Sequence, residues 1–218
     1  MQLNTVIFDM DGLLVDSEPL WDEAANAVFG KYGIRLTAQQ YATTTGLRTK
    51  EFIHWWFSMY NVPLSEIEAA EEAIIKKVIE LVKKKGRAMP GVQHIFEFFI
   101  SRGFKIGLAS SSPLSLIDTV TGLLGIQSHL QICTSAAALP YGKPHPQVYL
   151  DCAAALESAP TACLCFEDSY YGMIAAKAAR MKCVVVPEPK NAKDPRWTAA
   201  DLKIAALSNF NELLLASL

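Results

Sequence analysis

Four short groups of polar residues carry the side chains with which this chain could do chemistry: Asp9 with Asp11, Ser110 with Ser111, Lys143, and Glu167 with Asp168. Each group falls at, or just beyond, the end of a short apolar segment that is typical of a β-strand. In an open parallel sheet, ligands bind at the carboxyl ends of the strands, so groups that are distant in sequence meet there. The sequence therefore predicts one site that gathers carboxylates, a lysine and hydroxyl groups.

The chemistry of this predicted site follows from its charges. Four carboxylates repel one another unless a cation lies among them. Oxygen ligands without a histidine or cysteine partner favour magnesium over zinc, and magnesium takes a substrate phosphate as a further ligand. A magnesium ion beside Lys143 suits phosphoryl transfer, because both place positive charge on the transferred oxygens. We therefore predict a Mg²⁺-dependent phosphoryl-transfer site.

The nucleophile and the proton carrier are expected in the first acidic pair. The sequence has no GxSxG segment and no readable Ser-His-Asp spacing. A carboxylate can itself attack phosphorus and form an aspartyl-phosphate, and Asp9 lies nearest the strand. Asp11, two residues on, could protonate the leaving alkoxide and then deprotonate the attacking water.

The elements that must position these residues alternate along the chain. Apolar runs predict strands at Thr5–Phe8, Lys105–Ala109, Leu130–Thr134, Ala162–Phe166 and Cys183–Val186. Helices are predicted between and after them, at 92–102, 113–124, 146–156, 170–181 and 209–216. Short connections between alternating elements imply parallel strands with right-handed crossovers. The expected fold class is α/β, with a three-layer Rossmann-like parallel sheet.

A helical block interrupts this order directly after the first strand. Helical periodicity covers 19–33, 38–43, 50–60 and 65–85, and Ser65 with Glu68 has the spacing of a capping box. We predict a catalytic core of residues 1–15 and 87–218, with a small all-helical cap domain of residues 16–86 inserted in it.

The amino-acid composition limits the classes of protein to which this chain can belong. The 218 residues are 51% hydrophobic and 19% charged, with a net charge of −2 and no basic block. This composition indicates a globular protein and argues against nucleic acid as the main partner. The chain starts without a basic n-region, no apolar run approaches the roughly 18 residues of a spanning helix, and the cysteines lack CxxC spacing. We expect a cytoplasmic protein with reduced thiols and no membrane partner, present as a monomer or a weak dimer.

The polar groups also resemble a known family in their order. Asp9-Met10-Asp11-Gly12, Ser110, Lys143-Pro144 and Glu167-Asp168, with a helical insert after the first, look like the haloacid dehalogenase superfamily. The segments DMDGLLVDSEPLW, LASSSP, YGKPHPQVYLDCA and EDSYYGMIAAKAARM are similar to its β-phosphoglucomutase-like sugar-phosphatase branch. The resemblance spans essentially the whole chain.

This resemblance implies a role for each position. Asp9 would be the nucleophile and would bind Mg²⁺ together with the backbone carbonyl of Asp11 and the side chain of Asp168. Asp11 would be the general acid and base, and Glu167 would support the metal directly or through water. Ser110 and Lys143 would hold the phosphoryl oxygens. The residues expected to contact the substrate are Gly46 and Arg48 in the cap, Ser111 in the core, and Trp21.

The leading hypothesis is a phosphatase of small sugar or polyol phosphate monoesters, such as 2-deoxyglucose-6-phosphate or hexitol phosphates. A mutase of the same fold is the first alternative. Trp21 argues against it, because it stands where sequences resembling β-phosphoglucomutase carry a histidine, and an indole has no basic nitrogen. A non-enzymatic phospho-aspartate switch is a remote alternative, since it would need neither Asp11 nor a cap.

Overall fold

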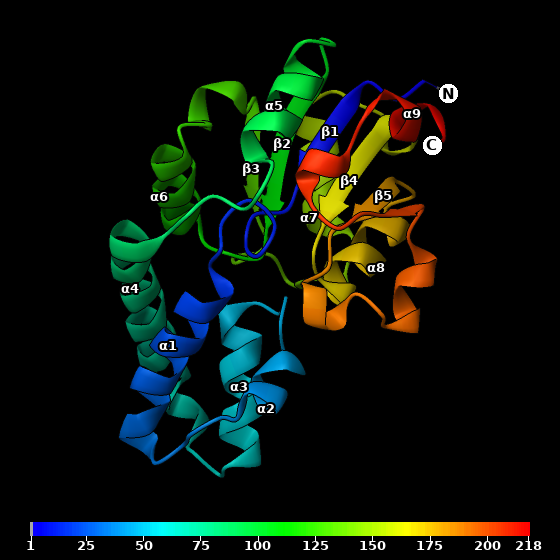
Figure 1. The fold of residues 1–218 in the computed structure, drawn as a ribbon. Helices are drawn as coiled ribbons and strands as arrows, with labels where there is room; N and C mark the ends of the chain where they lie inside the picture. The colour runs from blue at the N-terminus through cyan, green and yellow to red at the C-terminus, as the bar shows by residue number, and fades with distance from the viewer. Residues whose placement is uncertain (1) are drawn as a thin grey trace.

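A parallel sheet of six strands forms the centre of the computed structural model, which describes residues 2–218 (Figure 1). The strands are β1 (Thr5–Phe8), β2 (Lys105–Ser110), β3 (Ile132–Ser135), β4 (Cys163–Glu167), β5 (Lys182–Val185) and β6 (Leu202–Lys203), in the spatial order β3-β2-β1-β4-β5-β6. Phe8 lies opposite Leu108 on one side and Phe166 on the other. This register brings the carboxyl ends of β1, β2 and β4 to the same edge.

Helices cover both faces of the sheet and give it three layers. They are α5 (Val92–Ile100), α6 (Leu114–Leu124), α7 (Gln147–Ala155), α8 (Tyr170–Ala178) and α9 (Glu212–Ala216). Val6 and Phe8 of β1 pack in the core cluster that contains α5 and α6, whereas Ile7 packs in the cluster that contains α7 and α8. A strand buried on both faces explains the unbroken apolar run before Asp9. The predicted α/β fold class is confirmed.

The segment between β1 and α5 forms a helical region beyond the carboxyl ends of the strands (Figure 1). Its helices are α1 (Glu18–Phe29), α2 (Ala38–Ala42), α3 (Thr49–Met59) and α4 (Ile67–Lys85). Its buried apolar side chains belong to the same core cluster as Val6 and Phe8, and among them the Phe29 ring stacks on Phe52 with the ring centroids 5.4 Å apart.

Two extended segments join the helical region to the sheet, and they pair with each other. The Asp16 amide donates to the Arg87 carbonyl over 2.9 Å, and the Met89 amide donates to the Leu14 carbonyl over 2.9 Å. The chain therefore leaves the sheet and returns to it at one place.

Two features of the fold differ from the sequence-based expectation. The edge strand β6, only two residues long, was not predicted, because so short a segment carries no periodicity. The capping box predicted at Ser65 is wrong: Ser65 lies inside a 3₁₀ turn, and α4 begins without a side-chain cap. A capping box forms instead before α2, between Thr37 and Gln40.

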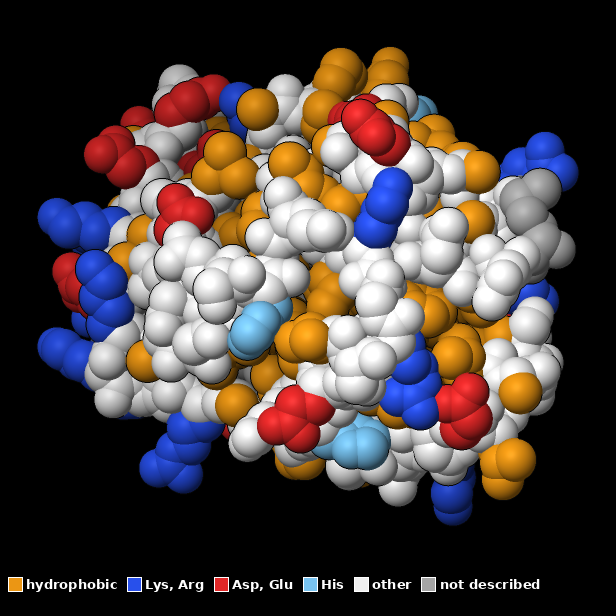
Figure 2. Space-filling model, turned by 90° about the horizontal axis from the view of Figure 1, so that it is seen from above, with side chains coloured by type: hydrophobic (Ala, Val, Ile, Leu, Met, Phe, Trp, Pro, Cys, Tyr) orange, Lys and Arg blue, Asp and Glu red, His pale blue; other side chains and the backbone are white. Residues whose placement is uncertain are grey.

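Three further features concern the charges on the surface, the polarity of the helices and the state of the cysteines. Acidic and basic side chains are interspersed on the face at the top of Figure 1, with hydrophobic side chains between them (Figure 2). Within residues 2–218, no helix has both the length and the apolar character that crossing a membrane requires. The five cysteines are present as free thiols, and all except Cys133 are buried.

Candidate active site

The polar groups predicted from the sequence converge at the carboxyl edge of the sheet, under the helical region. A cavity of about 70 Å³ opens there. The core contributes acidic, hydroxyl and lysine side chains to its lining: Asp9, Asp11, Ser110, Ser111, Lys143 and Asp168. The convergence follows from the parallel register, because β1, β2 and β4 end side by side.

Lys143 is the cation at the base of this cavity, and it is almost completely buried. Its Nζ donates to Asp9 Oδ1 over 2.5 Å, to Glu167 Oε1 over 2.7 Å and to the Ala109 carbonyl over 3.1 Å. Burial lowers the pKa of Lys143, but the charges of Asp9 and Glu167 outweigh this effect and raise it above its usual value. Lys143 is therefore a permanent cation with a fixed direction toward Asp9.

Glu167 is fully buried, and protein donors occupy both of its oxygens. Oε1 accepts from Lys143 and, over 2.5 Å, from the Tyr149 hydroxyl. Oε2 accepts from the backbone amides of Asp168 and Ser169 and from the Ser169 hydroxyl. A Cβ on Gly172 would lie 1.8 Å from Oε1, so only glycine fits there. These contacts suit Glu167 to hold its neighbours in place, and its direct contact with a metal stays a prediction.

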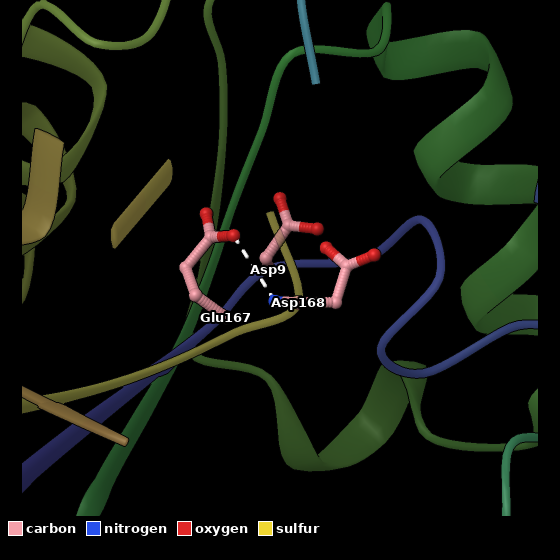
Figure 3. A group of neighbouring side chains, drawn as sticks. All are labelled: Asp9, Glu167 and Asp168. Carbon is pink, nitrogen blue, oxygen red and sulfur yellow. Dashed lines mark hydrogen bonds between the residues drawn. The ribbon is translucent and has the colours of Figure 1, made fainter. Parts of the chain in front are cut away.

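Asp9 and Asp168 present the free carboxylate oxygens of the site. One oxygen from each of Asp9, Glu167 and Asp168 lies within 4.8 Å of the others (Figure 3). The Asp168 carboxylate accepts no hydrogen bond from any residue in the range 2–218. Burial, followed by the charges of Asp9 and Glu167, raises the pKa of Asp168 well above its usual value. Neighbouring carboxylates that repel one another, with Asp168 lacking any donor, fit a hard divalent cation.

Gly12 is the residue that allows Asp168 to approach the end of β1. Its φ of +74° favours glycine, and a Cβ there would lie 2.1 Å from Asp168 Oδ2. The turn that follows Asp11 therefore requires the glycine that the sequence supplies at this position.

Asp11 lies outside this group of three carboxylates, and three side chains orient it. Its Oδ1 accepts from the Ser17 hydroxyl over 2.7 Å and from Trp21 Nε1 over 2.9 Å. Its Oδ2 accepts from the Ser112 hydroxyl over 2.7 Å. Trp21 lies on α1, so its bond links that helix to the proposed acid and base. Trp21 also lines the cavity, and its contact with the substrate stays a prediction.

The loops after β2 and before α3 meet across the cavity. Ser110 is buried, and its hydroxyl accepts from the Ser112 amide over 3.0 Å. The Ser111 hydroxyl donates to the Gly46 carbonyl over 3.2 Å. Gly46 has a φ of +86°, and a Cβ there would lie 3.0 Å from the Ser169 hydroxyl. These contacts hold the helical region against the core.

Arg48 was predicted to contact the substrate, but it does not line the cavity. Its guanidinium donates to the carbonyls of Ala136 over 3.3 Å, Pro140 over 3.4 Å and Leu139, and pairs with Glu51 over 2.6 Å. Arg48 therefore connects the helical region to the loop that precedes Lys143. A contact between Arg48 and the substrate stays a prediction.

Several cavity and support residues were not singled out from the sequence: Ser17, Glu18, Tyr41, Ser112, Tyr149, Ser169 and Gly172. Burial, followed by the charge of Asp11, raises the pKa of Glu18 to about 7. Ser17 and Glu18 could have been identified from the sequence as candidate site residues, because they lie close to Asp11 along the chain. Tyr149 likewise lies six residues after Lys143, and α7 places its hydroxyl 3.3 Å from Lys143 Nζ.

Comparisons with known proteins place this geometry in a family. A sequence profile described as haloacid dehalogenase-like hydrolase matches residues 6–186. The chain belongs to the haloacid dehalogenase-like hydrolases. It is 40% identical to hexitol phosphatase B of Escherichia coli over 208 residues, which covers 95% of this chain and 94% of that protein. It is 31% identical to a phosphorylated carbohydrates phosphatase of Thermotoga maritima over 181 residues, covering 81% of this chain and 82% of the relative.

Solved structures of this family share the fold. A β-phosphoglucomutase from Clostridium difficile superposes with a TM-score of 0.88, over 99% of this chain and 96% of that one, at 22% identity. At this identity the likeness establishes the fold alone.

Proposed function

We propose that this haloacid dehalogenase-like hydrolase is a Mg²⁺-dependent phosphatase that acts on small sugar or polyol phosphate monoesters through an aspartyl-phosphate on Asp9. The observation that carries the proposal is the environment of the Asp9 carboxylate. One of its oxygens is held by Lys143, and the donor-free Asp168 carboxylate lies beside it. When a cation fixes one oxygen of a carboxylate nucleophile, the second oxygen is free to face phosphorus.

The metal proposal depends on the donor set. Asp9 and Asp168 would hold the ion, with the backbone carbonyl of Asp11 as a further ligand and Glu167 orienting the two side chains. Bound Mg²⁺ supplies positive charge that offsets the mutual repulsion of these acids and of the phosphate. Oxygen-only donors and the lack of a neighbouring histidine in the group support magnesium over zinc.

The remaining chemistry belongs to side chains of the chain itself. Asp9 forms a bond to phosphorus as the bond from phosphorus to the leaving oxygen breaks, and Asp11 gives a proton to that oxygen. Lys143 and Ser110 neutralise and position the phosphoryl oxygens. Water then attacks phosphorus, Asp11 takes up a proton from it, and the bond to Asp9 breaks.

The helical region, residues 16–86 in our proposal, serves as a cap that excludes bulk water. The contact of Ser111 with Gly46 and that of Arg48 with the loop before Lys143 must open for substrate to enter. Backbone hydrogen bonds join Asp16 to Arg87 and Met89 to Leu14, so the two connecting segments together form one hinge about which the cap can move. The substrate class rests on the relatives named as hexitol and carbohydrate phosphatases.

A phosphate-release screen over sugar, polyol and nucleotide monophosphates, with Mg²⁺ present, tests this function. We expect the highest kcat/KM for a sugar or polyol phosphate and no release when a chelator is added. A nucleotide as the best substrate would overturn the substrate class, and full activity with the chelator would overturn the metal proposal.

A second assay separates the phosphatase from a mutase. β-Glucose-1-phosphate supplied with catalytic glucose-1,6-bisphosphate should yield mainly inorganic phosphate. The indole of Trp21 donates to Asp11 but has no basic nitrogen, so it cannot carry a proton between cap and core. Glucose-6-phosphate that accumulates faster than phosphate would favour the mutase.

A further inference from the structure

The part of the cavity that the cap lines differs from the part that the core lines. Its polar members are Glu18 and Trp21 on α1, Tyr41 on α2, and Thr44, Thr45 and Thr49 around the loop that leads into α3. Its apolar members include Ala25, Phe52 and Ile74. This mixture of hydroxyl, carboxylate and hydrocarbon groups is what a molecule with both C–H and O–H faces would match.

Several of these polar groups are free to bind a ligand, among them Glu18, Tyr41 and Thr45. Within residues 2–218, the carboxylate of Glu18 and the hydroxyls of Tyr41 and Thr45 make no hydrogen bond to protein, although all three line the cavity. Thr44 differs, because its hydroxyl donates to the Tyr41 carbonyl and accepts from Trp56. Partly buried polar groups without protein partners are groups that a ligand can satisfy.

The position of Glu18 is next to the phosphoryl end of the cavity. A Cβ on Gly12 would lie 3.6 Å from Glu18 Cγ and 2.1 Å from Asp168 Oδ2. A ligand whose phosphorus faces Asp9 would therefore have its adjoining atoms within reach of Glu18.

Positive charge is missing from the cap side of the cavity. Among the described residues that line it, Lys143 is the single cation, and Asp9 and Glu167 already pair with it. Arg48 is held on backbone carbonyls outside the lining, and Lys190, whose charge reaches Glu18, pairs with Glu188 over 2.8 Å. A second phosphate group on the substrate would therefore enter the cap side of the cavity with no cation there to pair with it.

We propose that Glu18, Tyr41 and Thr45 form a hydroxyl-binding subsite that receives the uncharged, polyhydroxylated part of a phosphate monoester and rejects bisphosphates. The carboxylate accepts hydrogen bonds from substrate hydroxyls, while the Tyr41 and Thr45 hydroxyls both donate and accept. Phe52 and Ile74 cover the C–H faces. This subsite rests on the proposed phosphatase function and adds the residues that select the substrate.

The test compares kcat/KM for three substrates of the intact protein with Mg²⁺: a hexitol 6-phosphate, phenyl phosphate, which has no hydroxyl beyond its phosphate, and fructose-1,6-bisphosphate. Wild type should prefer the hexitol phosphate over both others. Glu18→Ala should lower the ratio of the hexitol phosphate to phenyl phosphate by about tenfold to a hundredfold, the scale of a hydrogen bond to a charged group. Tyr41→Phe and Thr45→Val should lower the same ratio several-fold.

Glu23→Gln is the matched control, since it removes a carboxylate from the same helix at an exposed position paired with Lys85. It should leave both the ratio and the rates unchanged. Thermal unfolding of each variant shows whether the fold is retained, and Tyr41→Phe, which deletes one oxygen, serves if Glu18→Ala does not fold.

Two outcomes would overturn the subsite: an unchanged ratio in the folded Glu18 and Tyr41 variants, or a higher kcat/KM for the bisphosphate than for the hexitol phosphate. If wild type hydrolyses phenyl phosphate without favouring the hexitol phosphate, the subsite is wrong and the phosphatase stands. If wild type releases phosphate from no ester, the proposed function fails and the subsite with it.

Discussion

The two walls of the cavity differ in how completely their polar groups are satisfied. On the core wall, Lys143 and Glu167 are buried and hydrogen-bonded to several fixed partners. On the cap wall, Glu18 and Tyr41 line the cavity with no protein partner in the described chain. The end of the cavity proposed for phosphorus is therefore preorganised by the protein, whereas polar groups at the other end have no partner until a ligand binds. Preorganisation of this kind stabilises charge that develops during reaction.

The largest effect should come from replacing the proposed nucleophile. Asp9→Asn should lower phosphate release by at least about three orders of magnitude, as the loss of a covalent nucleophile does. The fold should remain, because the amide oxygen still accepts from Lys143 and one of several repelling acids has gone. Steady-state phosphate release and thermal unfolding measure the two results. Asp118→Asn, a similar change on an exposed stretch of α6, should alter neither.

The next largest effect should come from the cation of the core wall. Lys143→Ala leaves Asp9 and Glu167 buried without their shared partner, which costs about 3–5 kcal/mol of unfolding free energy. The rate should also fall at least about a hundredfold, because transition-state charge is no longer neutralised. Denaturant unfolding and turnover at increasing Mg²⁺ check this. Rescue by excess Mg²⁺ would show that Lys143 only shapes the metal site, and Lys50→Ala at an exposed pair is the control.

A backbone position tests how tightly the core wall is packed. Gly172→Ala would place a Cβ 1.8 Å from Glu167 Oε1 and force that carboxylate away from Lys143 and Tyr149. We expect a loss of about 2–4 kcal/mol in unfolding free energy. Gly122→Ala is the matched control, because that helical glycine has open space around it and alanine is favoured there by up to about 1 kcal/mol. Equal stability of the two variants would mean that Glu167 is not held in place as described.

The Mg²⁺ concentration that activity requires should depend differently on Asp168 and on Glu167. Asp168→Asn should raise the Mg²⁺ concentration for half-maximal activity about tenfold to a hundredfold, because it weakens a proposed ligand that has no other partner. Glu167→Gln should act mainly on stability, since its oxygens are occupied by protein donors. Magnesium titrations of activity, together with unfolding curves, separate the two. A larger shift in Mg²⁺ requirement for Glu167→Gln would make Glu167 the direct ligand.

The smallest effect is expected at Arg48, which joins the cap to the core outside the cavity. Arg48→Ala removes donors to the Ala136, Leu139 and Pro140 carbonyls and should raise KM several-fold with little change in stability. Arg48→Lys should recover little, because an ammonium group lacks the fork that spans these carbonyls. Amide hydrogen exchange should speed up in residues 136–142. If Arg48→Ala changes kcat/KM while amide hydrogen exchange in residues 136–142 stays normal, the predicted contact between Arg48 and the substrate is supported instead.

Much of the fold and of the site's core wall could be predicted from local patterns. The β-branched run before Asp9 gave the first strand, and the polar residues that follow later strands marked the edge where they meet. The cap wall could be predicted only in part: Trp21 and Gly46 line the cavity, but Glu18, Tyr41 and Thr45 were not singled out. Arg48 was expected at the substrate, but backbone carbonyls of a loop distant in sequence hold it. No local pattern encodes which carbonyls a flexible side chain will meet.

Local patterns were enough to predict the order of most strands and helices, the residues at the strand ends and the acidic, oxygen-only character of the site. These properties depend on side-chain type and on periodicity, which are local. Other contacts could be seen only in the folded chain: Trp21 donates to Asp11, the Tyr149 hydroxyl donates to Glu167, and Glu18 faces the cavity without a protein partner. Such contacts join elements through the packing of the whole chain, because the distance between two side chains depends on every element placed between them.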